Sequence, residues 1–157
     1  MRSKVARLGI IAGAGALPGQ IISACRDNGR DHYVLAFVGS ADPTLLRDAP
    51  TKWIRMGNLS KAIDEARKAG IEELVMVGKI PRPSILELIK DPRSAMFLTK
   101  VGTRILGDDN LLSAVVRELE ETEGFRVISP DSILEDLIAP AGSYGAVDPS
   151  ANEMKDI

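Results

Sequence analysis

The sequence predicts an α/β fold, a Rossmann-like parallel sheet with helices on both faces. Short, wholly apolar runs such as Leu8–Ala12 and Leu74–Val77 are typical of strands buried on both faces. Segments with helical spacing of apolar residues, such as Asn110–Glu123, alternate with these runs. The chain has 157 residues, enough for one domain with a proper core. Strand–helix alternation of this kind implies parallel strands joined by right-handed crossovers.

The predicted elements follow one another along most of the chain. Strands are expected at residues 8–12, 33–38, 52–55, 74–77 and 125–128, helices at 17–28, 60–69, 85–90, 94–106 and 110–123, a helical turn at 43–47 and a last apolar turn at 133–138. Ser60 is expected to cap the second helix and Gly70 to end it. The helix at 110–123 carries one apolar stripe, made of Leu111, Leu112, Val115, Val116 and Leu119.

Composition narrows the function classes. The 20 basic and 22 acidic residues give a formal charge of −2, so the balance carries no nucleic-acid signature. No apolar run approaches the roughly 18 residues that span a bilayer, and the short, glycine-broken run behind the basic start argues against a signal peptide. With Cys25 as the only cysteine there is no intramolecular disulfide. These features fit a cytoplasmic protein.

The composition changes after Ala139. Residues 140–157 contain prolines and glycines and show little apolar periodicity, so they cannot pack much of a core. We therefore expect a domain over residues 1–139, followed by a segment 140–157 that is either a frayed tail or a linker.

A glycine loop follows the first predicted strand. Gly13 and Gly15 supply the first two glycines of a dinucleotide fingerprint, but Pro18 stands at the third place. Because proline suits the first turn of a helix, Pro18 is compatible with the strand–loop–helix arrangement. The amides of Ala14, Gly15 and Ala16 could then face an anion. The acid expected at the end of the second strand is missing, because Asp42 comes only later. A phosphate contact, a nicotinamide site and a purely structural turn stay open, with the nicotinamide site disfavoured.

Two further segments carry candidate residues. Gly78, Lys79 and Arg82 directly follow a buried strand, and their two positive charges would suit a pyrophosphate, although a solvated basic loop explains them equally well. Asp108 and Asp109 precede the strong helix. They could hold a hard divalent cation, but capping of that helix accounts for them too.

Taken together, the motifs resemble one family. The segments are 10–18, 41–43, 56–61, 76–83, 107–109 and 123–125, and the likeness runs from about Leu8 to the region of Pro149. In order and spacing they are similar to the UDP-2,3-diacylglucosamine pyrophosphatase of lipid A biosynthesis, of the type found in many alpha-proteobacteria.

The resemblance implies an activity and an incomplete site. Members of the family hydrolyse UDP-2,3-diacylglucosamine to UMP and lipid X with a divalent cation, Mg²⁺ being the expected one. They have two domains, and their catalytic aspartate belongs to the second. No residue here matches it, so this chain resembles the first domain, with 140–157 as linker and no catalytic residue of its own.

From the position and chemistry of the three loops, the expected substrate-binding residues are Gly13, Ala14, Gly15, Gly78, Lys79, Arg82, Asp108 and Asp109. The expected ligands are UDP-2,3-diacylglucosamine and lipid X. A peripheral contact with the inner membrane through the lipid substrate, and a homodimer, are left open. The alternatives are a nucleotide-binding or dimerisation module without its own catalysis, and a nicotinamide-binding oxidoreductase domain.

Overall fold

The computed structural model describes residues 6–80, 92–105 and 111–134. Within these residues five parallel strands form one sheet in the order β3-β2-β1-β4-β5. The strands are β1 (Leu8–Ala12), β2 (His32–Phe37), β3 (Thr51–Ile54), β4 (Glu73–Val77) and β5 (Arg126–Ile128). The helices are α1 (Leu17–Asp27), α2 (Leu59–Lys68), α4 (Pro92–Ile105) and α5 (Leu111–Arg117), with short helical turns at η1 (Met56–Asn58), η2 (Glu118–Thr122) and η3 (Pro130–Ser132).

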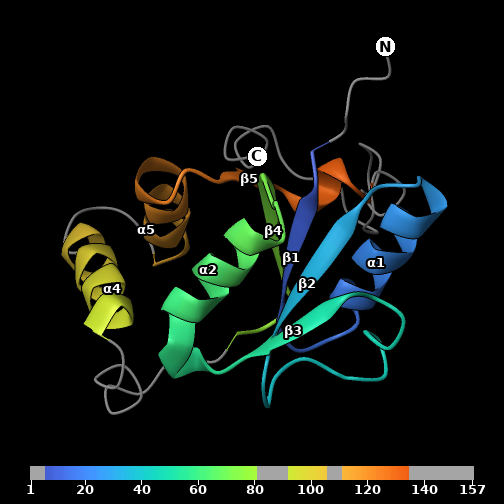
Figure 1. Cartoon of the computed structure of the whole chain (residues 1–157), viewed down its shortest axis with the longest axis horizontal. Coiled ribbons are helices and arrows are strands. Elements are labelled where there is room, and N and C mark those ends of the chain that lie inside the picture. The colour runs from blue at the N-terminus through green and yellow to red at the C-terminus, as the bar shows by residue number, and fades with distance from the viewer. Residues whose placement is uncertain (1–5, 81–91, 106–110, 135–157) are drawn as a thin grey trace, which may run out of the picture.

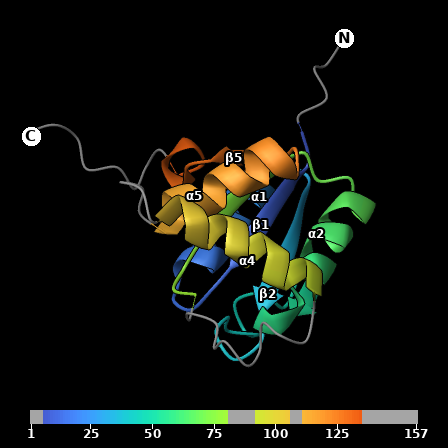
Figure 2. The same ribbon diagram turned by 90° about the vertical axis from the view of Figure 1, so that its left-hand side faces the viewer.

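Helices cover both faces of the sheet, as the sequence predicts. Helix α1 lies on one side, and α2, α4 and α5 lie on the other (Figure 1). Seen from that second side, α4 and α5 run next to each other in front of the sheet (Figure 2). The chain order reverses between β1 and β4, because β1 leads outward to β2 and β3 while β4 leads the opposite way to β5. In sheets of this kind, ligands bind beyond the carboxyl ends of the strands at that point.

The face that carries α1 holds a closely packed core. Leu8, Ile10 and Ala12 of β1 alternate toward α1, where Ile21 and Cys25 meet them; all five are buried. Burial raises the pKa of the Cys25 thiol, with Arg30 opposing the shift, so Cys25 serves as a small apolar core residue rather than a reactive thiol.

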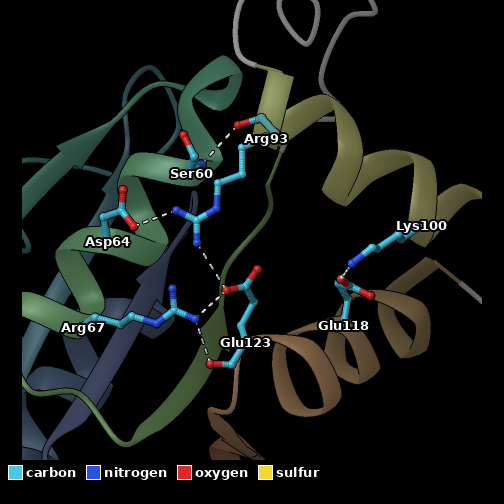
Figure 3. Close-up of polar contacts among 8 residues, drawn as sticks. Ser60, Asp64, Arg67, Arg93, Lys100, Glu118 and Glu123 are labelled. Carbon is cyan, nitrogen blue, oxygen red and sulfur yellow. Dashed lines mark hydrogen bonds and ion pairs between the residues drawn. The ribbon is translucent and has the colours of Figure 1, made fainter.

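The other face is covered by α2, α4 and α5, which are held together partly by charge. Arg93 of α4 lies between Asp64 of α2 (2.8 Å) and Glu123 (3.6 Å), which also accepts a hydrogen bond from Arg67 (2.6 Å) (Figure 3). The Arg93 and Asp64 side chains are about half exposed, whereas the Glu123 side chain is 11% exposed. The apolar residues of these helices pack in one cluster with those of the sheet.

One local expectation is wrong, and another needs a qualification. Ser60 does not cap α2: Asn58 holds the N-cap position, and Ser60 sits inside the first turn, where its amide donates to the buried Ser94 Oγ of α4 at 3.1 Å. Leu112 lies on the predicted apolar stripe with Val115 and Leu119, and all three line one cavity, but Leu112 stands at its rim and is 60% exposed. Gly70 does end α2, with a φ of 66°.

Other boundaries shift by small amounts. The long helix predicted at 110–123 is α5 as far as Arg117 and then widens into the π-type turn η2. Residues 43–47 form hydrogen-bonded turns, with the Leu45 amide donating to the Asp42 carbonyl. The helix predicted at 85–90 and the segment 140–157 lie outside the described residues. None of the helices among the described residues is long and apolar enough to cross a membrane.

Candidate functional site

The loops that follow β1 and β4 are joined by their backbones. Ala14 and Lys79 form an antiparallel bridge in which the Ala14 amide donates to the Lys79 carbonyl (2.8 Å) and the Lys79 amide donates to the Ala14 carbonyl (3.0 Å). One residue earlier, the Gly13 amide donates to the Val77 carbonyl at 2.8 Å. The two loops predicted to share a site therefore lie side by side, at the carboxyl edge of the sheet and at its topological switch point.

Two of the glycines are required by this junction. A Cβ on Gly13 would lie 2.3 Å from the Lys79 carbonyl oxygen, and one on Gly78 would lie 2.6 Å from the Ala14 carbonyl oxygen. Gly78 also has a φ of 86°, which L side chains rarely adopt. Gly15 differs, because its φ is 105° but a Cβ there would meet no atom within 4 Å. Gly13 and Gly78 hold the loops together, whereas Gly15 faces open space.

The junction changes which backbone groups remain for a ligand. The Ala14 amide is already bonded to Lys79, so the expectation that it faces an anion is wrong. In the part of the chain that the structure describes, no hydrogen bond engages the amides of Gly15 and Ala16. Helix α1 starts directly after them, with Pro18 in its first turn and no side-chain cap on Ala16. These amides and the positive end of the helix dipole suit a phosphate oxygen.

Lys79 adds a charge to the same edge. Its side chain is exposed, and within the described residues it forms no ion pair. The structure thus brings Gly13, Ala14 and Gly15 together with Gly78 and Lys79. Arg82, Asp108 and Asp109 lie outside the described residues, and their predicted roles remain predictions.

The acid that a dinucleotide site would need does not stand at the end of β2. That strand ends at Phe37, and Asp42 follows five residues later. The Asp42 carboxylate accepts hydrogen bonds from the hydroxyl and the amide of Thr44, both at 2.8 Å. The hydroxyl bond first, and the amide bond second, hold the Asp42 pKa below its ordinary value. Asp42 is therefore engaged in its own turn rather than poised for a ribose.

The described residues do not fit a divalent cation. Among them there is no group of three or more histidine, cysteine, aspartate or glutamate side chains that could hold a metal ion. His32, half-buried, uses its Nδ1 in a 3.0 Å hydrogen bond with the Arg30 carbonyl.

Sequence reasoning missed a cavity next to this junction. It has a volume of about 470 Å³ and lies between the sheet and helices α2, α4 and α5. Its lining includes Ile11 and Met76 of the sheet, Ala62 of α2, Phe97 of α4 and Val115 of α5, and it reaches Gly78. No sequence signal could have found it, because a side chain that lines a cavity has the same apolar spacing as one that fills a core.

Comparison with known proteins places the chain in a family. Residues 7–137 match the family described as the LpxI N-terminal domain. The chain belongs to this family. Over 153 residues it is 34% identical to the UDP-2,3-diacylglucosamine pyrophosphatase LpxI of Caulobacter vibrioides, and the match covers 96% of this chain but 54% of that protein. The LpxI N-terminal domain described here thus spans about half the length of that relative.

Solved structures share only the fold. The UDP-glucose 4-epimerase of Brucella ovis in complex with NAD matches with a TM-score of 0.50 and 12% identity, over 80% of this chain and 35% of that one. WbmG of Bordetella bronchiseptica in complex with NAD matches with a TM-score of 0.49 and 14% identity, over 82% and 38% of the two chains. At such identities the LpxI N-terminal domain shares a Rossmann-like architecture with the epimerase, and no ligand follows from it.

Proposed function

We propose that this LpxI N-terminal domain is the substrate-binding half of an enzyme that hydrolyses UDP-2,3-diacylglucosamine. Water would be added across the pyrophosphate, giving UMP and lipid X, the 2,3-diacylglucosamine 1-phosphate. The observation that carries the proposal is the 34% identity, along 96% of this chain, to a Caulobacter protein of that name. A cytoplasmic site that meets its substrate at the inner membrane is part of the proposal, because the substrate is a lipid.

The geometry of the carboxyl edge supports the binding role. The amides of Gly15 and Ala16 and the start of α1 would meet one side of an anionic pyrophosphate. Lys79, held next to them by the backbone bridge, would bring an ammonium group to the same phosphates. The amides at the start of α1 and the bridge that positions Lys79 are already formed in this structure, so binding of a pyrophosphate would need little rearrangement of the loops.

Catalysis is not assigned to the described residues. Pyrophosphate hydrolysis needs a positioned water and charge stabilisation in one place. Among the described residues there is no group of three or more histidine, cysteine, aspartate or glutamate side chains that could hold a metal ion. The divalent cation, expected to be Mg²⁺, and the reacting groups would therefore come from elsewhere in the complete enzyme, with the undescribed Asp108 and Asp109 the remaining candidates in this chain.

Binding and turnover experiments test the proposal. Calorimetric titration of the purified chain with UMP and with lipid X is expected to show binding, whereas NADH should give no fluorescence enhancement. The chain alone is expected to release no UMP from UDP-2,3-diacylglucosamine.

Each contrary result points to a different function. Silence with UMP and lipid X would favour a structural or dimerisation module. Enhancement of NADH fluorescence would favour an oxidoreductase domain. Rapid UMP release would place the catalytic group in this chain after all.

A further inference from the structure

Exposed apolar side chains gather in one segment of the chain, between the end of β2 and the end of β3. Among the described residues the large apolar side chains that stand exposed are Val38, Leu45, Trp53, Met96 and Leu112. The first three, at 52%, 39% and 40% exposure, all belong to that one segment. Single exposed apolar residues are ordinary on a protein surface, whereas a group of them marks a contact surface.

The fold brings these three side chains to one corner of the sheet. The Val38 amide donates to the Ile54 carbonyl at 2.9 Å, which places Val38 next to Trp53 at the end of the edge strand β3. Ile54 packs in the apolar cluster with α2, so alternation along β3 points Trp53 to the opposite face, that of α1. Leu45 lies against α1 too, because a Cβ on Gly19 would be 3.4 Å from the Leu45 Cβ. We call Val38, Leu45 and Trp53 the β2–β3 corner.

Two cations border the β2–β3 corner. Arg55 follows β3 directly, and Lys61 lies in the first turn of α2. Figure 1 shows the loop after β2, the end of β3 and the start of α2 on the same side of the molecule. Both cations are exposed, and within the described residues neither forms an ion pair. The acids that follow on α2 are engaged, since Asp64 pairs with a cation of α4 and Glu65 accepts a hydrogen bond from Tyr33.

The charge of this side is therefore positive. Lys79, which follows β4, adds a third exposed cation to the carboxyl edge, against the single acid Asp42 in the loop after β2. Exposed apolar groups flanked by cations are what a peripheral protein needs to hold an anionic lipid surface, because the apolar groups enter between the headgroups while the cations attract them.

We propose that the β2–β3 corner, with Arg55 and Lys61, docks the protein on a bilayer that contains anionic lipids. The inference rests on the proposed function, in which the substrate is a membrane lipid, and it names the surface that meets the bilayer and the headgroup charge that this surface selects. An indole ring prefers the boundary between membrane and water, which is the place that Trp53 would take. Lys79 lies along the same edge, so docking turns the candidate phosphate site toward the headgroups.

Trp53 reports directly on the docking, because it is the only tryptophan in the chain. The purified 157-residue chain is titrated with vesicles of phosphatidylcholine alone and with vesicles of phosphatidylcholine and phosphatidylglycerol in equal parts. Tryptophan emission is expected to shift to shorter wavelength with the anionic vesicles only, and the chain should sediment with them. Raising the salt from about 50 to about 500 mM should weaken the binding, since it screens surface charges.

Lys61 and Lys68 provide a matched pair of variants. Both are exposed lysines of α2 without an ion pair in the described residues, but Lys68 lies at the opposite end of the helix. Lys61→Gln should weaken vesicle binding about fivefold, and the double variant with Arg55→Gln about 25-fold, whereas Lys68→Gln should not change it.

The apolar part of the surface is tested in the same way. Val38→Ser should weaken vesicle binding, whereas Met96→Ser, which removes an equally exposed apolar side chain from α4, should not.

Three results would overturn the inference. They are no binding of anionic vesicles by a folded wild-type chain, equal binding of both vesicle types, and equal affinities of Lys61→Gln and Lys68→Gln. Tryptophan emission that shifts with protein concentration alone, without vesicle binding, would instead make the corner a contact between two copies of the chain.

A parallel titration with UMP and lipid X keeps this inference separate from the proposed function. If these ligands bind and the vesicles do not, the docking surface is wrong and the proposed function stands. If the vesicles follow the predicted order while neither UMP nor lipid X binds, the β2–β3 corner is a membrane surface and the proposed pyrophosphatase role fails.

Discussion

The two edges of the sheet are held together by different interactions. At the carboxyl edge the loops after β1 and β4 meet through main-chain hydrogen bonds between Ala14 and Lys79. At the amino edge, charged side chains make the contacts: Glu73 at the start of β4 pairs with Arg30 and with Arg126. An open depression of about 930 Å³ lies at this amino edge, lined by these residues together with Arg67 and Glu123.

This difference separates a binding edge from a stabilising edge. At the amino edge Glu73 pairs with Arg30 and Arg126, and Glu123 pairs with Arg67, so these charges largely serve one another. At the carboxyl edge the backbone does the joining, which leaves the Lys79 ammonium and the amides of Gly15 and Ala16 available. The bridged loops at the carboxyl edge are therefore a better candidate for a binding site than the larger depression at the amino edge.

The largest expected effect comes from breaking the backbone junction. Gly13→Ala places a Cβ against the Lys79 carbonyl, so the loops must separate and lose both hydrogen bonds of the bridge. Strain and lost hydrogen bonds should together lower the free energy of unfolding by about 2–5 kcal/mol. Urea denaturation of the purified chain measures it.

Gly102→Ala is the control for this change. Gly102 lies inside α4, and a Cβ added there would meet no atom within 4 Å, so alanine should raise stability by about 0.5–1 kcal/mol. If Gly13→Ala were as harmless as Gly102→Ala, the junction would be looser than the geometry shows, and the carboxyl edge would not be pre-formed.

At the amino edge, removal of the Glu73 carboxylate should lower the stability of the fold. The Glu73 side chain is 7% exposed and the Arg30 side chain 18%, so Glu73→Gln leaves a mostly buried guanidinium without its anion. We expect the free energy of unfolding to fall by about 1.5–3 kcal/mol, as for a lost hydrogen bond between charged groups. Asp64→Asn removes a pair with Arg93 in which both side chains are about half exposed, and should cost about 0–1 kcal/mol.

The same two variants are also compared for their affinity for UMP. Neither Glu73→Gln nor Asp64→Asn should alter UMP binding, because both residues lie away from the carboxyl edge. A selective loss of UMP affinity in a folded Glu73→Gln chain would move the binding site to the amino edge and reverse the assignment of the two edges.

Sequence patterns predicted the strands and helices better than the contacts between them. The apolar run at Leu8–Ala12 and the stop at Gly70 both appear as predicted, because local composition determines a buried strand and a helix end. The bridge between Ala14 and Lys79 joins residues far apart in sequence, so no local pattern could show that the Ala14 amide is occupied. The same applies to Ser60: a serine before a helical segment predicts a cap, but here a neighbouring helix supplies Ser94 instead.

The next prediction concerns the charge at the carboxyl edge. Lys79→Ala removes the ammonium but keeps the backbone bridge, so UMP binding should weaken by about 1–3 kcal/mol while stability barely changes. Lys68→Ala, an exposed lysine at the end of α2 near the other edge, should change neither. Calorimetric titration of both variants tests this; equal UMP affinities of Lys79→Ala and wild type would remove Lys79 from the site.

The smallest effect is expected at Asp42, in the loop after β2 on the same carboxyl edge. The Thr44 hydroxyl is the main cause of its lowered pKa, so Thr44→Val should raise the Asp42 pKa toward its ordinary value, and Thr44→Ser should keep it low. An acid with a lowered folded pKa stabilises the fold above its unfolded pKa and loses that contribution as the pH falls through the folded one. Thr44→Val should therefore be slightly less stable than wild type at neutral pH, and the difference should vanish in acid below the folded pKa. NMR titration of the carboxyl carbon measures the shift.

UMP affinity should be the same in all three proteins, because Asp42 shapes its own turn. A loss of affinity in Thr44→Val alone would instead make that loop part of the binding edge.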